Sequence, residues 1–313
     1  MNVVLIAEES AGIQTLRTLC ETEHRIVAVL ASPLQRSSSG ASVFLAASRL
    51  GVPVWPADLV KNADLAERLQ AEQVDIIFNV HSLHIIHDEI LRAPSVGAFN
   101  LHPGPLPKYA GLNAVSWAIY RGETLHGVTL HKMSPEIDAG PIVYQSLFPI
   151  REEDTALSLN VKCVNEGLFL LRRALDEVAK GSPLPLIPQD LNEREYFGRQ
   201  VPENGRLTWD WPATKILNFV RACDYFPFRS PWGHPSIELE RTDIGIVKAS
   251  RTGRPCNAMP GTVGDGREQG ALVASGDEWV FVTKVKVGKN YFPAHKILHA
   301  GQYLGKARIP IEQ

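Results

Sequence analysis

Short apolar runs alternate with amphipathic stretches over residues 1–150 of the chain. Predominantly apolar runs predict buried strands at residues 3–7, 26–31, 74–80 and 98–101, and a shorter strand at 52–55. Apolar residues at helical spacing predict helices between these strands, at residues 12–21, 41–50, 64–73 and 87–91. Strands without a polar face that alternate with helices are typical of a parallel sheet covered by helices on both sides.

Beyond this region the pattern predicts two further strands, at residues 128–132 and 142–150, on either side of a polar loop. Apolar residues three and four apart then predict one long helix over 156–181 that ends at Gly181. Residues 182–210 are rich in Pro, Gly and charged side chains, which indicates a linker.

The part of the chain after the linker changes character. A helix is predicted at residues 216–223, and short strands follow at residues 236–239, 244–249, 261–263, 271–274 and 280–287. Short strands at turn-rich spacing are typical of a small β barrel, and a chain of 313 residues suits two domains. The sequence therefore predicts an α/β fold: a Rossmann-like, mostly parallel sheet in residues 1–181, the linker 182–210 and a small β barrel in residues 211–313.

The composition is that of an ordinary globular protein, with 44% apolar and 21% charged residues. A net charge of −2 provides no global basic field for non-specific binding to nucleic acid. The four cysteines lie far apart without paired spacing, which favours reduced thiols over a zinc site or a disulfide framework. No apolar stretch reaches the roughly 18 residues that a spanning helix needs, and the N-terminal run lacks the basic flank of a signal peptide. We therefore expect a cytoplasmic protein without membrane contact.

Polar side chains follow two of the predicted strands at their carboxyl ends. Asn79 and His81 close one strand, and Asn100 and His102 close the next. Ligands bind at this edge of parallel sheets, and residues two apart on an extended segment share a face. Asp138, from a neighbouring loop, could orient the imidazole of His102. An amide, an imidazole and a carboxylate suit a reaction in which negative charge builds on a carbonyl oxygen, such as acyl transfer.

Two other kinds of site are disfavoured. The first turn carries Glu8 and Glu9 and lacks the G-x-G-x-x-G pattern, so its carboxylates would repel a dinucleotide pyrophosphate. His81, His84 and His87 are three apart, but no carboxylate ligand pattern accompanies them, so we expect no metal. Other histidines are interpreted as structural or surface residues: His126, His131, His234, His295 and His299.

The central motif carries a family resemblance. It comprises Phe99-Asn100-Leu101-His102-Pro103, Leu106-Pro107-Lys108-Tyr109, Gly127-Val128-Thr129 and Asp138-Ala139-Gly140. Together with the later segments Tyr196-Phe197-Gly198-Arg199 and Pro260-Gly261-Thr262-Val263, it resembles the 10-formyltetrahydrofolate-dependent formyltransferases over nearly the whole chain.

This resemblance implies a Rossmann-like catalytic domain, an OB-like C-terminal domain and 10-formyltetrahydrofolate as co-substrate. It implies that Asn100, His102 and Asp138 are catalytic. An acceptor amine would attack the formyl carbon, Asn100 and a protonated His102 would hold the oxyanion, and Asp138 would keep His102 charged. The pterin is expected to hydrogen-bond to the backbone of two segments, which are Leu83, His84, Ile85 and Ile86, and Ser134, Pro135, Glu136 and Ile137.

The loop after His102 departs from the family pattern. Gly104-Pro105-Leu106-Pro107 stands where the family more often has Ser-Leu-Leu-Pro, and Ala110 stands where it often has Arg. Leu112 occupies the position of an Arg in the aminoarabinose-type enzymes. These positions are expected to face the acceptor, so they leave the chemistry credible and the acceptor undefined.

The distribution of basic residues bears on the identity of the acceptor. Methionyl-tRNA formyltransferases carry a basic insertion near the second strand, whereas residues 31–40 here hold one arginine and no lysine. The lysines of the last strands are interpreted as solvated side chains: Lys284, Lys286, Lys289 and Lys296. The N-terminal half looks closer to the sugar-nucleotide (aminoarabinose) formyltransferases.

We expect a small-molecule amine as acceptor, either an amino sugar nucleotide or an amine or hydroxylamine of a secondary-metabolite or siderophore pathway. Transfer to tRNA is disfavoured but stays open as an alternative, as does hydrolysis of 10-formyltetrahydrofolate with water as acceptor. The sequence gives no prediction of the oligomeric state.

Overall fold

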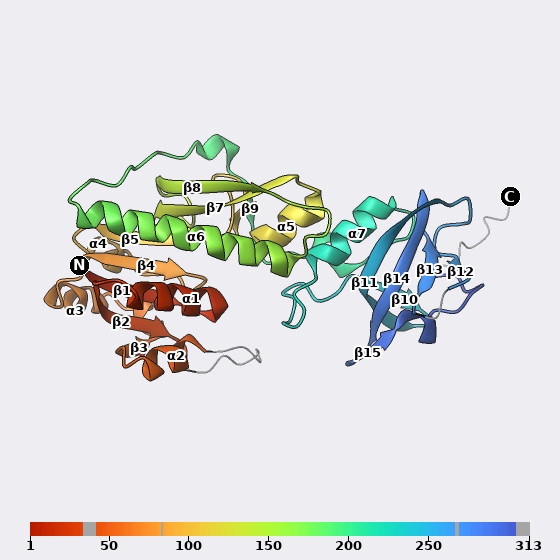
Figure 1. The fold of residues 1–313 in the computed structure, drawn as a ribbon, viewed down its shortest axis with the longest axis horizontal. Coiled ribbons are helices and arrows are strands. Elements are labelled where there is room, and N and C mark those ends of the chain that lie inside the picture. The colour runs from red at the N-terminus through yellow and green to blue at the C-terminus, as the bar shows by residue number, and fades with distance from the viewer. Residues whose placement is uncertain (34–41, 83, 267–268, 305–313) are drawn as a thin grey trace. The chain divides into compact units, whose positions relative to one another are not determined.

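The computed structural model describes residues 1–33, 42–82, 84–266 and 269–304. The chain forms two compact units that each take several segments of the sequence. The first unit is Met1–Ala114, Leu125–Pro149 and Asn160–Gly198, and the second is Val115–Thr124, Ile150–Leu159 and Arg199–Gln313. Figure 1 shows the elements of both units along the chain.

The described part of the first unit holds a seven-stranded sheet in the order β3-β2-β1-β4-β5-β7-β8. Five strands are parallel: β1 (Asn2–Ala7), β2 (Arg25–Ala31), β3 (Val54–Pro56), β4 (Ile76–Val80) and β5 (Gly97–His102). Two antiparallel strands complete the edge: β7 (Leu125–Lys132) and β8 (Ile142–Pro149). The order reverses between β1 and β4, so the site expected at the carboxyl ends lies beside the switch point of the sheet.

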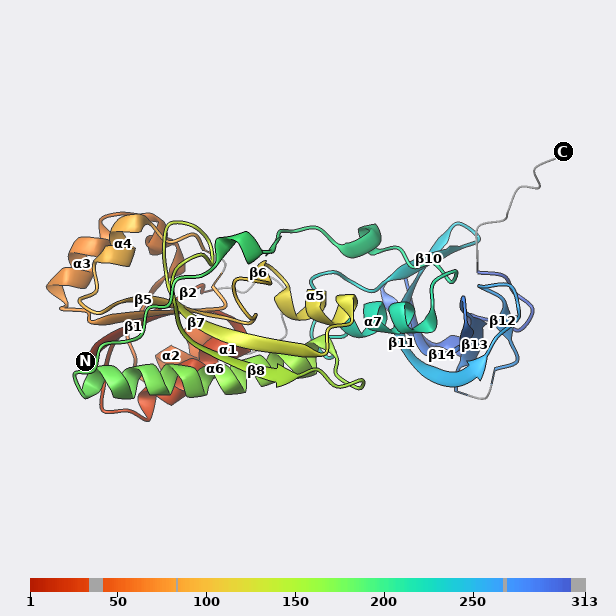
Figure 2. The same cartoon turned by 90° about the horizontal axis from the view of Figure 1, so that it is seen from above.

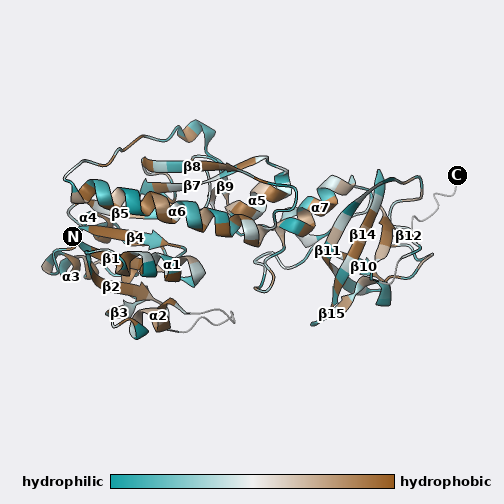
Figure 3. Cartoon of the chain, viewed as in Figure 1, coloured by the Kyte–Doolittle hydropathy of each residue, from teal (hydrophilic) through white to brown (hydrophobic). Residues whose placement is uncertain are grey.

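Helices cover both faces of this sheet, as Figure 2 shows, with α1, α2 and α6 on one face and α3 and α4 on the other. Their bounds are α1 (Glu9–Cys20), α2 (Val43–Arg49), α3 (Leu65–Ala71), α4 (Asp88–Arg92) and α6 (Ala156–Ala179), with the 3-10 turn η1 (Ala57–Lys61) between β3 and α3. Every residue of β4 is buried, which explains why the central strands read as predominantly apolar runs. Figure 3 shows this apolar character along the strands.

The strands and helices predicted from the hydrophobic pattern are all present, and their ends agree within a few residues except where β11 and β7 run longer. The pattern did not predict α5 (Ala114–Arg121). This helix is a short run of eight largely apolar residues, and such a run does not distinguish a buried helix from a buried strand. The pattern also missed the short paired strands β6 (Ala110–Gly111) and β9 (Tyr196–Phe197).

The second unit contains α7 (Ala213–Ala222) and an antiparallel sheet in the order β10-β11-β14-β13-β12, with β15 paired to the end of β14 beyond β13. The strands are β10 (Ser236–Leu239), β11 (Thr242–Pro255), β12 (Val263–Gly264), β13 (Ala271–Ala274), β14 (Glu278–Val287) and β15 (Asn290–Pro293). Register shifts along β11 let this long strand bend around a core that includes Trp209, Ile216 and Val280. The predicted α/β class with a mostly parallel Rossmann-like sheet is confirmed, and the small β barrel predicted after it is a curled antiparallel sheet.

Three 3-10 turns complete the described elements: η2 (Leu191–Glu193), η3 (Pro202–Gly205) and η4 (Ala294–Lys296). None of the described helices combines the length and apolar character that crossing a bilayer requires.

Candidate active site

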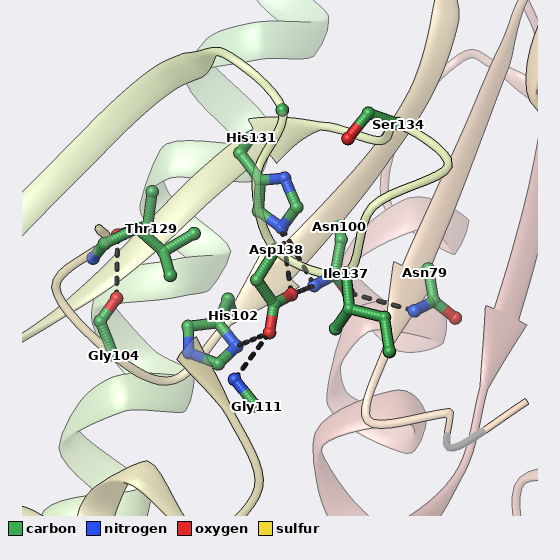
Figure 4. A network of polar contacts seen from close by, with 12 residues as sticks. Asn79, Asn100, His102, Gly104, Gly111, Thr129, His131, Ser134, Ile137 and Asp138 are labelled. Atoms are coloured by element: carbon green, nitrogen blue, oxygen red, sulfur yellow. Dashed lines mark hydrogen bonds and ion pairs between the residues drawn. The ribbon is translucent and has the colours of Figure 1, made fainter. Parts of the chain in front are cut away.

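Strand register brings three polar side chains into one row at the carboxyl end of the sheet. Asn79 on β4 lies opposite Asn100 on β5, and Asn100 lies opposite His131 on β7. Asn79 donates from Nδ2 to Asn100 Oδ1 at 2.9 Å, which fixes the orientation of the Asn100 amide. Asn100 Nδ2 then points to His131 Nε2, 3.1 Å away (Figure 4).

Asp138 is the hub of the network, and its side chain is buried. Its Oδ1 accepts a hydrogen bond from Asn100 Nδ2 at 3.2 Å and lies 3.4 Å from His131 Nε2. Its Oδ2 accepts the Gly111 N–H at 2.8 Å and lies 3.5 Å from His102 Nδ1. The structure thus brings together Asn100, His102 and Asp138 as the sequence predicts (Figure 4).

The surroundings of Asp138 determine its charge. Burial opposes ionisation of the carboxyl group, but His102, His131 and the Gly111 N–H together hold the pKa of Asp138 well below its usual range. The group is therefore a carboxylate at neutral pH, and it can hold an imidazolium that forms beside it.

His102 is also buried, and both ring nitrogens face oxygen atoms. Its Nε2 donates to the Tyr109 carbonyl oxygen at 2.7 Å, and its Nδ1 faces Asp138 at the longer distance of 3.5 Å. Burial lowers the pKa of His102, although the Asp138 carboxylate and the Tyr109 carbonyl favour the charged form. His102 in this structure therefore favours the neutral imidazole, in contrast to the protonated form expected from the sequence.

The unusual loop after His102 is explained by its contacts. Thr129, opposite His102 in the sheet, donates to the Gly104 carbonyl at 2.7 Å and accepts the Leu106 N–H at 3.2 Å. A Cβ at Gly104 would lie 2.9 Å from His102 Nε2, so a residue with a side chain would displace the imidazole. Gly104 therefore leaves room for the His102 ring in its present orientation.

The two segments expected to bind the pterin follow β4 and precede Asp138. Ser134, Pro135, Glu136 and Ile137 lead directly into Asp138, and Ser134 Oγ donates to the Glu136 carbonyl at 2.9 Å. His84, Ile85 and Ile86 follow β4, whereas Leu83 lies outside the described residues. Ile86 belongs to a buried cluster, and Met133, the residue before Ser134, packs against that cluster.

His131 is the site residue that the sequence analysis missed. The sequence indicates a structural or surface residue at this position, whereas the structure buries His131 within hydrogen-bonding reach of Asn100 Nδ2. Its other nitrogen, Nδ1, donates to the Lys132 carbonyl at 3.1 Å. The antiparallel register between β5 and β7 places His131 opposite Asn100. Without that register the sequence gives no indication that His131 belongs to the network.

The three regularly spaced histidines do not form a cluster. His87 Nδ1 accepts the Glu89 N–H at 3.3 Å as the cap of α4, and His81 Nδ1 lies 3.4 Å from Glu9 Oε2. Within the described ranges, no group of three His, Cys, Asp or Glu side chains has the arrangement of a metal site.

A buried histidine behind the site makes the stability of the fold depend on pH. His126 donates from Nε2 to the Pro103 carbonyl at 3.0 Å, and its buried Nδ1 has no partner among the described residues. Burial lowers the pKa of His126 to about 4. Between about pH 6.5 and about pH 4 this histidine is therefore protonated in the unfolded chain and neutral in the folded chain. The free energy of unfolding should fall by about 1.4 kcal/mol for each pH unit over this range.

Urea unfolding over this pH range checks the prediction, and His126→Gln, which keeps a donor for Pro103, is the matched variant. The variant should show a flatter dependence of the unfolding free energy on pH. The neutral His102 contributes in the same direction, so part of the slope should persist. An equal slope in both proteins would contradict the assignment to His126.

The fold and the site together define a class of protein. A parallel sheet that presents an amide, an imidazole and a carboxylate at its carboxyl ends is suited to enzymes that stabilise charge on a carbonyl oxygen. Residues 2–175 match the model of the formyl transferase family, and residues 200–301 match the model of the formyl transferase C-terminal domain. The chain belongs to the formyl transferase family and is a formyl-transferring enzyme.

Solved structures with the same fold agree with this assignment. The chain is 20% identical to the N-formyltransferase from Helicobacter canadensis, a complex with folinic acid and dTDP-3-aminofucose, with a TM-score of 0.68 over 90% of this chain and 98% of that one. It is 19% identical to the sugar 3N-formyl transferase WlaRD, with a TM-score of 0.66 over 90% and 97% of the chains. HypX from Aquifex aeolicus, in complex with tetrahydrofolic acid, is 21% identical with a TM-score of 0.68, but 96% of this chain spans only 47% of that one.

Proposed function

We propose that this enzyme transfers a formyl group from 10-formyltetrahydrofolate to the amine of a small-molecule acceptor, as an N-formyltransferase. The observation that carries the proposal is the buried network of Asn100, His102 and Asp138 at the carboxyl ends of the strands. The co-substrate is supported by solved relatives that hold folinic acid or tetrahydrofolic acid. The acceptor class is supported by the relative that holds dTDP-3-aminofucose and by WlaRD, a sugar 3N-formyl transferase.

The proposed mechanism assigns one task to each polar group. The acceptor nitrogen forms a bond to the formyl carbon, and one N–H of the Asn100 amide turns from His131 Nε2 to the oxygen on which negative charge develops. Neutral His102 accepts the proton of the attacking amine at Nδ1, because Nε2 already donates to the Tyr109 carbonyl, and Asp138 stabilises the imidazolium that results. Collapse of the intermediate breaks the bond to the folate nitrogen, and His102 returns the proton to that nitrogen.

The finer assignments belong to the same proposal. The segments His84–Ile86 and Ser134–Ile137 hold the pterin through their backbone. Leu83, which lies outside the described residues, belongs to the same assignment. Residues 1–181 act as the catalytic domain, 182–210 as the linker and 211–313 as an OB-like domain, in a cytoplasmic enzyme. Transfer to tRNA and hydrolysis are the competing activities, and no feature of the described site favours either.

Incubation with 10-formyltetrahydrofolate and a panel of acceptors tests the proposal. We expect release of tetrahydrofolate with an amino sugar nucleotide such as dTDP-3-aminofucose, and none with the His102→Ala variant. Steeply salt-dependent binding and formylation of charged initiator tRNA would identify the tRNA enzyme instead, and formate release without an acceptor would identify the hydrolase. Absence of folate-dependent turnover with every acceptor, water included, would overturn the proposal.

A further inference from the structure

The stretch between α6 and the end of β9 lies against the candidate active site, although its composition predicts only a linker. Its start is tied to β8, because Ile187 and Ile142 exchange two backbone hydrogen bonds of 2.9 and 2.8 Å. Its end is β9, which pairs with β6. Residues 187–197 are called the clasp below.

Two side chains of the clasp hold the loop that carries Asp138. Gln189 donates from Nε2 to the carbonyl oxygens of Asp138 and Gly140, at 2.9 and 2.6 Å. Its Oε1 is buried without a hydrogen-bond partner in the described part of the chain, so within that part the Gln189 side chain bonds to the loop of Asp138 alone. Arg194 donates from Nη2 to the Ile137 carbonyl at 2.8 Å.

These contacts matter because the backbone of Asp138 is strained. Its φ of 54° lies in the left-handed region, which is costly for a residue other than glycine and persists only where the surroundings enforce it. The carboxylate direction depends on that backbone conformation. The Gln189 and Arg194 hydrogen bonds are the ones that restrain it from the clasp side.

The clasp also holds the loop that follows His102. The N–H of Ala110 donates to the Glu195 carbonyl at 2.9 Å, and the N–H of Leu112 donates to the Phe197 carbonyl at 2.7 Å. Gly111, between them, is left with its N–H directed at Asp138 Oδ2, 2.8 Å away. The clasp therefore restrains both the loop of Asp138 and the donor that binds its carboxylate.

We propose that the clasp positions Asp138 against His102, with Gln189 and Arg194 as positioning residues of the transfer reaction. The proposal rests on the proposed function for its kinetic readout. In the described part of the chain neither residue has a hydrogen bond or ion pair to His102 or Asn100, so both act through the loop of Asp138. The charge of Asp138 favours the protonated form of His102, and a displaced carboxylate should therefore weaken that support.

The kinetic test compares Gln189→Met, which keeps the side-chain size and removes both donated bonds, with Gln70→Met at an exposed position of α3. For Gln189→Met we expect kcat to fall about tenfold to a hundredfold, with the KM of the acceptor little changed. The acid limb of the pH profile should move to lower pH, because His102 loses support for its protonated form. Gln189→Lys restores donors to the two carbonyls and should recover part of the lost kcat, and Gln70→Met should behave as wild type.

A second measurement needs no turnover. Hydrogen exchange of the Gly111 amide should become about tenfold faster in Gln189→Met, while amides of β1 keep their rates. If the wild-type enzyme shows no folate-dependent turnover, the proposed function fails and the exchange result still decides whether the clasp restrains Asp138. Unchanged Gly111 exchange, or faster exchange with wild-type kcat and pH profile, would overturn the positioning role.

Discussion

Replacement of Asp138 by Asn is expected to lower kcat by about a thousandfold and leave the fold intact. Asn keeps the size of the side chain but lacks the charge that stabilises an imidazolium on His102. The carboxylate faces four groups, which are Asn100 Nδ2, His131 Nε2, the Gly111 N–H and His102 Nδ1. An Asn oxygen can still accept the Gly111 N–H, and the side chain keeps its volume, so we expect the variant to fold.

Steady-state kinetics with a saturating acceptor measure the loss, and thermal unfolding monitors the fold. Asp58→Asn is the matched control, because Asp58 is an exposed carboxylate in η1, away from the network. The depressed pKa of Asp138 means that its charge stabilises the folded state above about pH 3.8, so the melting temperature should fall modestly at neutral pH. Turnover equal to wild type would contradict the pairing of Asp138 with His102.

Part of the site could be predicted from sequence because it depends on local patterns. The apolar run that ends at Leu101 defines a buried strand, and Asn100 and His102 share a face by the period of two. The Asp138 turn was linked to them by the family motif. These residues follow from features that lie within a few positions of each other.

The rest of the site depends on pairings between distant segments. His131 joins Asn100 only through the antiparallel register of β7 on β5, and no pattern within either strand specifies that register. Gln189 is separated from Asp138 by a long helix, in a stretch whose Pro, Gly and charged residues indicate no regular structure. Its two hydrogen bonds to the loop exist because Ile187 pairs with Ile142, a contact that sequence spacing does not encode.

The protonation state of His102 likewise depends on a feature that the sequence does not give. A carboxylate neighbour alone would predict a raised pKa for the imidazole. The structure adds nearly complete burial, which acts in the opposite direction and prevails. A neutral His102 fits a group that first accepts a proton from the amine, so the correction changes its proposed role from a permanent cation to a proton acceptor.

Replacement of Gly111 by Ala is the second change with a large expected effect. The φ of Gly111 is +90°, in the region that favours glycine, and a Cβ there would overlap the Phe197 carbonyl oxygen. Relief of this overlap requires β6 to separate from β9 and moves the N–H that donates to Asp138. We expect a loss of about 3 kcal/mol in unfolding free energy and a fall in kcat of about a hundredfold.

Gly51→Ala provides the matched control, because Gly51 also has a positive φ, of 70°, but a Cβ there meets no atom within 4 Å. That variant should show only the backbone cost, about 1 kcal/mol, and wild-type kcat. Urea unfolding and steady-state kinetics are measured on the wild type, Gly111→Ala and Gly51→Ala. They separate the backbone cost, which both variants share, from the overlap and the lost contact to Asp138, which apply at Gly111. Equal losses of stability in the two variants, with kcat retained in both, would show that the β6–β9 contact does not hold Asp138 in place.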